Sequence, residues 1–138
     1  MKAIKATSKF YCGIDVSGDS LDVCYQAPGG NLEWYKCTNN AEGFKQIWQH
    51  TGKLYHFVME STGVYQLPFC FFLESKKARY SVVNALQIKR YIQMKLERNK
   101  TDKKDAFHLC MYGVDHTFEY YEMPSHLYLE CRAINNAI

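Results

Sequence analysis

Two aspartates stand three residues apart in the most basic part of this 138-residue chain, as Asp102 and Asp105 in the stretch NKTDKKD. On a helix, residues at positions i and i+3 project from one face, so both carboxylates would point the same way. Two further acids, Asp15 and Glu60, stand where apolar, strand-like runs end. Sites in α/β sheets are built at such strand ends. The pattern therefore predicts that four carboxylates converge.

A carboxylate cluster of this kind requires positive charge. Two carboxylates about 4 Å apart repel each other by roughly 4 kcal/mol at an effective dielectric constant near 20. Hard divalent cations with oxygen ligands relieve this repulsion, and Mg²⁺ is the common choice for phosphate chemistry. Two such ions about 4 Å apart can activate an attacking oxygen and stabilise a leaving oxygen in phosphodiester displacement. We therefore expect Mg²⁺ as the cofactor, with Mn²⁺ as an alternative.

The aspartates lie among basic residues that could hold phosphates. The candidate nucleic-acid-binding residues are Lys89, Arg90, Lys95, Arg98, Lys100, Lys103 and Lys104. The net charge of +3 is too small to argue for a nucleic-acid partner by itself, so the argument rests on this clustering. The competing interpretation is a solvated helix and loop, with the interleaved Tyr91, Ile92, Met94 and Leu96 anchoring it to the core. A strand-end aspartate such as Asp15, taken alone, is also more often a turn or cap residue than a ligand.

The elements that must position these residues follow from hydrophobic patterning. Residues 10–16, 21–27 and 32–38 are β-branched and aromatic runs separated by the turn sequences SGDS and PGGN. Such short links join antiparallel neighbours, because a parallel return needs a crossover of a dozen or more residues. The first three strands are therefore expected to form an antiparallel sheet.

The rest of the chain alternates helices with strands. A helix is predicted within 39–52, with Gly52 as a candidate C-cap. A strand over 55–61, a helix over 64–76 and a strand over 80–84 follow. Further helices come next, one of them beginning near Thr101. Helical crossovers favour parallel pairing of the later strands. The order βββαβαβα is that of an α/β, ribonuclease-H-like fold.

Composition limits the class of protein. A chain of 138 residues that is 47% hydrophobic is expected to form a single globular domain. The six cysteines show no Cys-x-x-Cys spacing and are expected to be buried and reduced, and the five histidines lack the spacing of zinc ligands. We expect neither a signal peptide nor a membrane span, because MKAIKATSKF contains no apolar core of signal-peptide length and VYQLPFCFFLES is too short to cross a bilayer. We expect a cytoplasmic protein without a membrane partner.

Four motifs resemble a known family in order and spacing. They are GIDVSGDSLDV (13–23), MESTGVY (59–65), VVNALQIKRY (82–91) and RNKTDKKDA (98–106). Together they resemble the N-terminal domain of the DEDD transposases of bacterial insertion sequences. This group includes the Piv-type DNA invertase and the bridge-RNA-guided recombinases. The resemblance covers about residues 10–115.

The resemblance implies a RuvC-like nuclease fold whose catalytic and metal-binding tetrad is Asp15, Glu60, Asp102 and Asp105. It implies DNA as substrate, with a structured guide RNA and a homo-oligomer as further partners. Two positions depart from the family pattern. Gly18 stands where the family often has lysine, and the usual Asn-Pro is replaced by Asn84 followed by alanine. Neither departure touches the tetrad.

The resemblance also implies that catalysis needs two domains. Residues 1–123 are expected to form the RuvC-like catalytic domain, and residues 124–138 to begin a helix leading to a C-terminal domain that is missing here. That second domain carries a serine nucleophile in the family, so the chain alone is not expected to exchange DNA strands.

Two alternatives come from other classes. Actin-like sugar kinases and ATPases share the fold core, and their first strand also ends in an aspartate. They bind phosphate through a glycine beside that aspartate, whereas Val16 follows Asp15 here, and 138 residues leave no room for their second lobe. The other alternative is a catalytically silent nucleic-acid-binding module.

Overall fold

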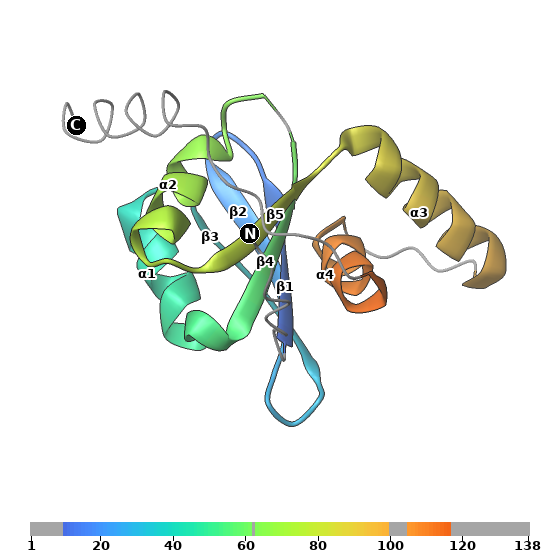
Figure 1. The fold of residues 1–138 in the computed structure, drawn as a ribbon, viewed down its shortest axis with the longest axis horizontal. Coiled ribbons are helices and arrows are strands. Elements are labelled where there is room, and N and C mark those ends of the chain that lie inside the picture. The colour runs from blue at the N-terminus through green and yellow to red at the C-terminus, as the bar shows by residue number, and fades with distance from the viewer. Residues whose placement is uncertain (1–9, 62, 100–104, 117–138) are drawn as a thin grey trace, which may run out of the picture.

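The computed structural model describes residues 10–61, 63–99 and 105–116. Its centre is a five-stranded mixed sheet with the strand order β3-β2-β1-β4-β5 (Figure 1). The strands are β1 (Phe10–Val16), β2 (Ser20–Gln26), β3 (Leu32–Thr38), β4 (Tyr55–Glu60) and β5 (Arg79–Val83). The first three pair antiparallel, and β1–β4 and β4–β5 pair parallel. The predicted α/β, ribonuclease-H-like fold is confirmed.

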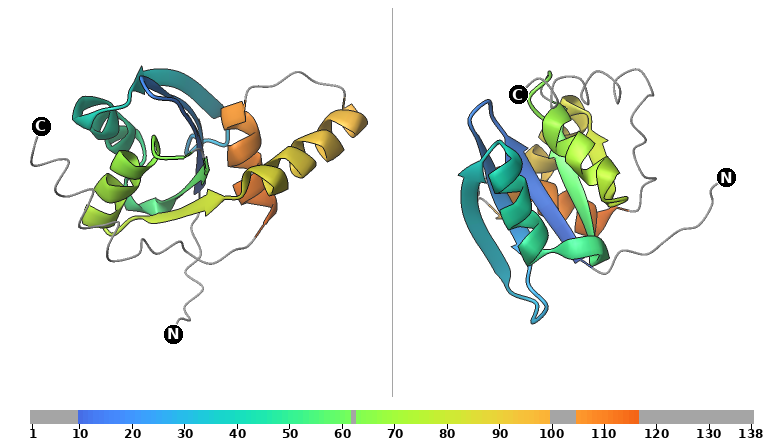
Figure 2. Two further views of the ribbon diagram at one scale, coloured as in Figure 1. Left: turned by 90° about the horizontal axis from the view of Figure 1, so that it is seen from above. Right: turned by 90° about the vertical axis from the view of Figure 1, so that its left-hand side faces the viewer.

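Helices cover both faces of the sheet. They are α1 (Ala41–His50), the short 3₁₀ helix η1 (Gly52–Leu54), α2 (Leu67–Ser75), α3 (Ala85–Asn99) and α4 (Asp105–Asp115). Helices α1 and α2 lie against one face, and α4 lies against the other (Figure 2). Helix α3 leaves the end of β5 and projects past α4 (Figure 1). The sheet is therefore the middle layer of a three-layer domain.

The main core lies between the sheet and helices α1 and α2. Alternate residues of β1, such as Cys12 and Ile14, point into it and are fully buried. Aromatic side chains fill most of the remaining space, and the ring centroids of Phe57 and Phe69 lie 5.9 Å apart. On the opposite face, two smaller clusters pack under α3 and α4, around Val58 and around Cys24.

Local signals explain the ends of the helices. The Asn40 side chain accepts a hydrogen bond of 3.1 Å from the backbone N–H of Gly43, which caps the start of α1. The cap at the other end is Thr51, and the predicted Gly52 is the next residue, with a φ of 75° that favours glycine. Helix α2 begins at Leu67 rather than at 64, because turns occupy the preceding residues and Pro68 suits a first helical turn.

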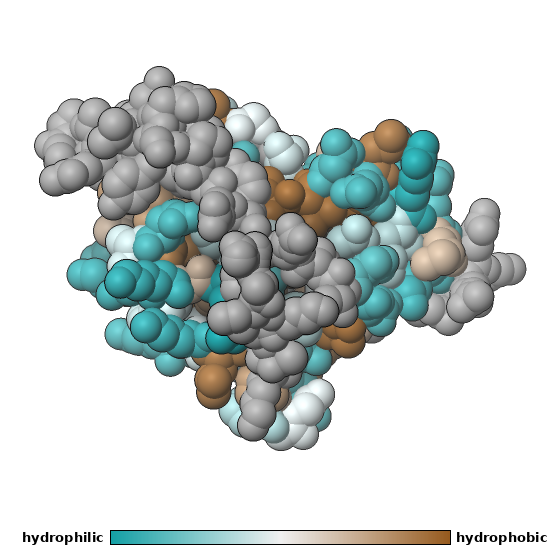
Figure 3. All heavy atoms as spheres, in the orientation of Figure 1, coloured by the Kyte–Doolittle hydropathy of each residue, from teal (hydrophilic) through white to brown (hydrophobic). Residues whose placement is uncertain are grey.

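The predictions for α3 and for the residues that follow it are only partly confirmed. Tyr91 is buried, as expected of a core anchor, but Met94 is exposed, because it lies on α3, which projects from the sheet, and no other described residue covers it. Figure 3 shows mostly hydrophilic residues along α3, interrupted by hydrophobic ones. The side chain of Leu96, the expected helix start at Thr101 and the division into 1–123 and 124–138 lie, wholly or in part, outside the described residues.

The cysteine prediction is confirmed where the structure describes the chain. Five cysteines are buried there and form no disulfide, namely Cys12, Cys24, Cys37, Cys70 and Cys110. In the same ranges, no helix has the length and apolar character needed to cross a bilayer.

Candidate active site

Charged side chains form a row across the face of the sheet that α4 covers. Strand pairing places Asp15 of β1 opposite Asp22 of β2, and Asp22 opposite Lys36 of β3. The parallel pairing of β1 with β4 brings Glu60 to the level of Asp15 on the other side. Side chains alternate between the faces of a sheet, and the apolar neighbours of these residues point into the main core. The row therefore crosses four adjacent strands on one face.

Helix α4 lies unusually close to the strand that carries Asp15. A Cβ atom at Gly13 would collide with the carbonyl oxygen of Ala106 and the amide nitrogen of Cys110. The backbone of α4 thus rests directly on β1, which only glycine at position 13 permits. Because Asp105 is the first residue of α4, this contact brings its carboxylate toward the strand ends that carry Asp15 and Glu60.

The carboxylates affect one another electrostatically. The pKa of Asp15 is raised from 3.8 to about 6, mainly by burial and then by the negative charges of Asp105, Asp22 and Glu60, in that order. Burial also raises the pKa of Glu60, with Asp105 again adding to the shift. Because Asp105 raises the pKa of both other acids, the three described tetrad carboxylates share one acidic region. Asp102, the fourth predicted member, lies outside the described residues.

The negative charge of this region is not neutralised by the described part of the chain. The ion pairs among the described residues join Lys36 to Asp22 and Lys95 to Asp115. Neither pair involves Asp15, Glu60 or Asp105. Among the described residues, no three histidine, cysteine, aspartate or glutamate side chains gather closely enough to enclose a metal ion. The donor chemistry nevertheless suits a hard divalent cation, because the candidate donors are carboxylate oxygens, and Asp15, Glu60 and Asp105 form no ion pair with another described residue.

Loops beyond the strand ends frame the acidic region. The side-chain amide of Asn39 donates hydrogen bonds to the carbonyl oxygens of Ser17, at 2.9 Å, and Tyr65, at 3.1 Å. It thereby ties together the chain segments that follow β1, β3 and β4. The backbone N–H of the exposed Ser61 donates to the carbonyl oxygen of Val83, which extends the pairing of β4 with β5, and Gly63 follows with a φ of 86° that favours glycine.

The predicted phosphate-binding residues fall into three groups. Lys89 and Arg90 are exposed on α3. Lys95 instead has partners within the domain, since its ammonium group lies 3.2 Å from the carboxylate of Asp115 and 5.5 Å from the ring centroid of Tyr91. The other candidates lie outside the description, either for the side chain (Arg98) or for the whole residue (Lys100, Lys103 and Lys104).

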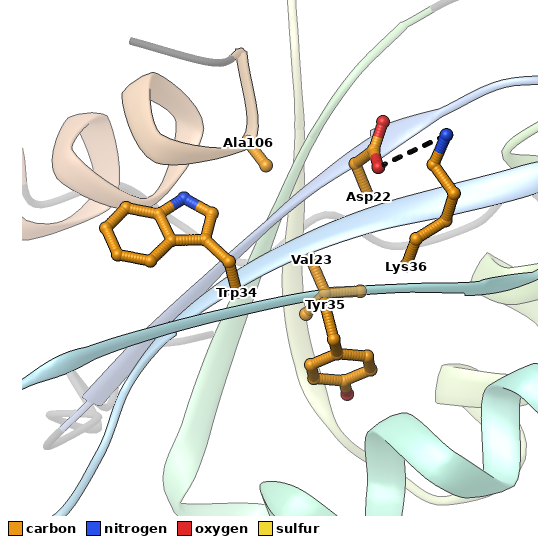
Figure 4. Close-up of a pocket in the computed structure, with 6 residues that line it drawn as sticks. All are labelled: Asp22, Val23, Trp34, Tyr35, Lys36 and Ala106. Atoms are coloured by element: carbon orange, nitrogen blue, oxygen red, sulfur yellow. Dashed lines mark ion pairs between the residues drawn. The ribbon is translucent and has the colours of Figure 1, made fainter.

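Sequence reasoning missed a pocket beside the acidic region. The pocket has a volume of about 180 Å³, and its lining residues are Asp22, Val23, Trp34, Tyr35, Lys36 and Ala106 (Figure 4). Asp22 lies inside a quoted family motif, but its place next to Asp15 depends on strand register. The alternation of side chains along β3 could have predicted that Trp34 and Lys36 share one face of the sheet. It could not have predicted that α4 lies beside them.

Comparison with known proteins identifies relatives of this chain. Residues 12–137 match the DEDD family described as "Transposase". A pilin gene-inverting protein of Moraxella bovis is 34% identical over 114 residues, which are 77% of this chain and 34% of the relative. A pilin gene-inverting protein of Moraxella lacunata is 33% identical over the same shares.

The chain spans about a third of the length of these curated relatives. The family match nevertheless covers nearly all of it, including Asp15, Glu60 and Asp105. The resemblance that the motifs predicted is confirmed. This chain belongs to the DEDD family of transposases.

Proposed function

We propose that this chain supplies the metal-dependent, RuvC-like part of a DNA recombination site, in which Asp15, Glu60, Asp102 and Asp105 hold divalent metal. Domains of this family generally depend on divalent metal ions, and Mg²⁺ is the proposed ion, with Mn²⁺ as an alternative. The observation that carries the proposal is the raised pKa of both Asp15 and Glu60, to which the charge of Asp105 contributes. Perturbed acids gathered at strand ends are typical of functional sites.

The residues of the chain have distinct roles in this proposal. Bound metal would stabilise the charge that develops on the oxygens of a phosphodiester during strand cleavage and exchange. Asp15 and Glu60 would provide ligand oxygens from the rigid sheet, and Asp105 would provide them from α4. Because Asp15 holds a proton up to about pH 6, metal must displace that proton at lower pH. Metal affinity should therefore rise with pH through that range.

Metal binding can be tested by thermal unfolding. A ligand that binds the folded state stabilises it, by about 2.7 kcal/mol at a concentration 100 times its Kd. We expect Mn²⁺ or Mg²⁺ to raise the Tm of the wild-type chain and to leave that of Asp15→Asn unchanged. Asp19→Asn, on an exposed turn near the same strand end, is the matched control and should respond like wild type. An equal response from Asp15→Asn would contradict the site.

The names of the two relatives refer to inversion of pilin genes, and we infer that this chain acts on DNA. The exposed Lys89 and Arg90 are then the first candidates for phosphate contacts. Each contact with a duplex phosphate adds about 0.9 to the slope of log affinity against log salt. Arg90→Ala should therefore flatten the slope by about 1 unit. Lys95→Ala should flatten it less, because Lys95 already pairs with Asp115. Equal slopes for Arg90→Ala and wild type would indicate that the exposed basic face of α3 is solvated and does not contact phosphate.

Several predictions extend to the whole protein. A structured guide RNA, a homo-oligomer, a cytoplasmic location and a second domain with a serine nucleophile all stay predictions. If the serine domain is required, purified residues 1–138 will not exchange strands between donor and target DNA, even with cognate RNA. Strand exchange by this chain alone would contradict that prediction.

The two alternative functions differ in how the findings bear on them. The family match gives no support to the sugar kinase or ATPase interpretation. A catalytically silent nucleic-acid-binding module predicts DNA binding without any metal response at Asp15. The thermal unfolding experiment separates this interpretation from the proposed one.

A further inference from the structure

Trp34 is a large aromatic residue left open to solvent beside the acidic region. It lies on β3, an edge strand of the sheet, and its side chain is 46% exposed. Phe107 of α4 supports one side of the indole, with ring centroids 6.4 Å apart and an angle of 22° between the planes. Single exposed apolar residues are common on protein surfaces and need no explanation alone. The surroundings of Trp34 distinguish it.

Trp34 and Lys36 border the pocket together. Figure 4 shows their side chains, with that of Asp22, on the side of the sheet where Ala106 lies, whereas the Tyr35 ring points the other way. The ammonium group of Lys36 lies 3.8 Å from a carboxylate oxygen of Asp22 and is largely exposed. An aromatic face and a solvent-accessible cation thus stand two residues apart on one strand, with their Cα atoms about 7 Å apart.

We propose that Trp34 and Lys36 form a subsite for one nucleotide of single-stranded DNA. The base stacks on the indole, and Lys36 binds the adjoining phosphate. Aromatic side chains accept any base in this way, because every base has a π-face, and a lysine provides a mobile point charge for phosphate. This inference rests on the proposed function of the chain.

The position of the subsite fits a strand that reaches the carboxylates. Lys36 and Asp15 stand in one row, separated by β2, so their backbones are about 10 Å apart. That distance corresponds to a few nucleotide steps at most. One single strand can therefore occupy the subsite and the acidic region at the same time.

The test uses the whole chain labelled with 5-fluorotryptophan and a fluorescein-labelled oligothymidylate. The chain contains two tryptophans, Trp34 and Trp48, so each gives one fluorine resonance, and Trp34→Phe assigns them. We expect the Trp34 resonance to shift in a saturable manner as oligonucleotide is added. The Trp48 resonance should stay in place, since that ring packs against Phe57 on the opposite face of the sheet. Fluorescence anisotropy of the oligonucleotide reports total DNA binding in parallel.

Variants separate the subsite from the rest of the interface. Trp34→Ala should weaken oligonucleotide binding at least about fivefold, because stacking on one aromatic residue contributes this much or more. Trp34→Phe should retain most of the affinity. Leu54→Ala, at an exposed apolar residue outside this pocket, is the control and should bind like wild type.

Each outcome decides the proposal. DNA binding by anisotropy with an unshifted Trp34 resonance, or wild-type affinity in Trp34→Ala, overturns the subsite and leaves the proposed DNA function standing. No binding of single-stranded or duplex DNA by the wild-type chain counts against the proposed DNA function, and the subsite falls with it.

Discussion

The two faces of the sheet are covered in different ways. Under α1 and α2, side chains meet side chains, and Phe69 packs with Phe44 and Phe57 at ring-centroid distances of 5.2 and 5.9 Å. Under α4, a helix backbone rests on a strand backbone at Gly13. The first face is apolar throughout its cluster. The second has small apolar clusters and carries the row of charges at the strand ends.

We infer that one face of the sheet mainly determines stability, whereas the other mainly determines the geometry of the acidic region. Aromatic and aliphatic side chains pack together on the first face, and its core cluster contains no charged residue. Close backbone packing on the second face leaves little apolar area but fixes where α4 begins, and hence where Asp105 stands. We therefore expect substitutions on the first face to alter stability most. Substitutions on the second face should alter the pKa values of the carboxylates.

The largest effect is expected from Phe69→Ala. Phe69 is fully buried, and removing a core phenylalanine costs about 3–5 kcal/mol of unfolding free energy. Urea denaturation measures the loss, and Leu54→Ala, at an exposed site, should change stability by less than about 0.5 kcal/mol. The pKa of Asp15, followed by carboxyl NMR, should stay near 6 in the folded variant. A fall in that pKa would show that the two faces are coupled.

Gly13→Ala should have a smaller effect on stability and a larger one on the site. The added methyl group must displace α4, at a cost of about 1–3 kcal/mol. The pKa of Asp15 should move toward its ordinary value, because both burial and the charge of Asp105 raise it in the wild-type chain. Gly29→Ala is the control, since nothing lies near that glycine. An unchanged Asp15 pKa would mean that α4 does not determine the acidic region.

Asp15→Asn should stabilise the chain at neutral pH. The folded-state pKa of Asp15, about 6, exceeds the ordinary 3.8, so the folded chain binds more protons between these values and wild-type stability falls as pH rises through them. Because Asp15 is half-exposed and solvent screens the charges, the gain is on the order of 1 kcal/mol at pH 7.5 and vanishes near pH 4. Thermal unfolding at several pH values, without metal, measures it. Destabilisation at pH 7.5 would contradict the electrostatic account.

Asp115→Asn should show the smallest effect, with the opposite sign. Burial tends to raise the pKa of Asp115, but hydrogen bonds from Tyr91 and Lys95 outweigh it and hold the pKa below its usual range. Such a group stabilises the fold above its unfolded-state pKa, and the stabilisation is lost as pH falls through its folded-state pKa. The variant should lose a few tenths of a kcal/mol at pH 7, because the side chains of Lys95 and Asp115 are 34% and 38% exposed and solvent screens their charges. Greater stability than wild type at pH 7 would contradict this account.

Much of the fold was predictable, because its strands and turns are short-range patterns. The alternation and turn residues of 10–38 predicted three antiparallel strands, and each is present within a residue of its expected bounds. Met94 was wrongly expected in the core, because helical periodicity does not reveal which side of a helix has a neighbour. Trp34 and Lys36 were missed for a related reason, since their relation to α4 depends on strand register.

The sequence by itself determined the order of the elements and the positions of Asp15 and Glu60 at strand ends. These properties follow from side-chain preferences acting over a few residues. The tertiary structure alone decided that Asp22 joins the acidic row, that Lys95 pairs with Asp115, and that α4 meets β1 at Gly13. These contacts join residues far apart in the chain, and their energies depend on register and close packing. The raised pKa of Asp15 results from the same contacts, since burial and neighbouring charge exist only once the sheet and α4 have assembled.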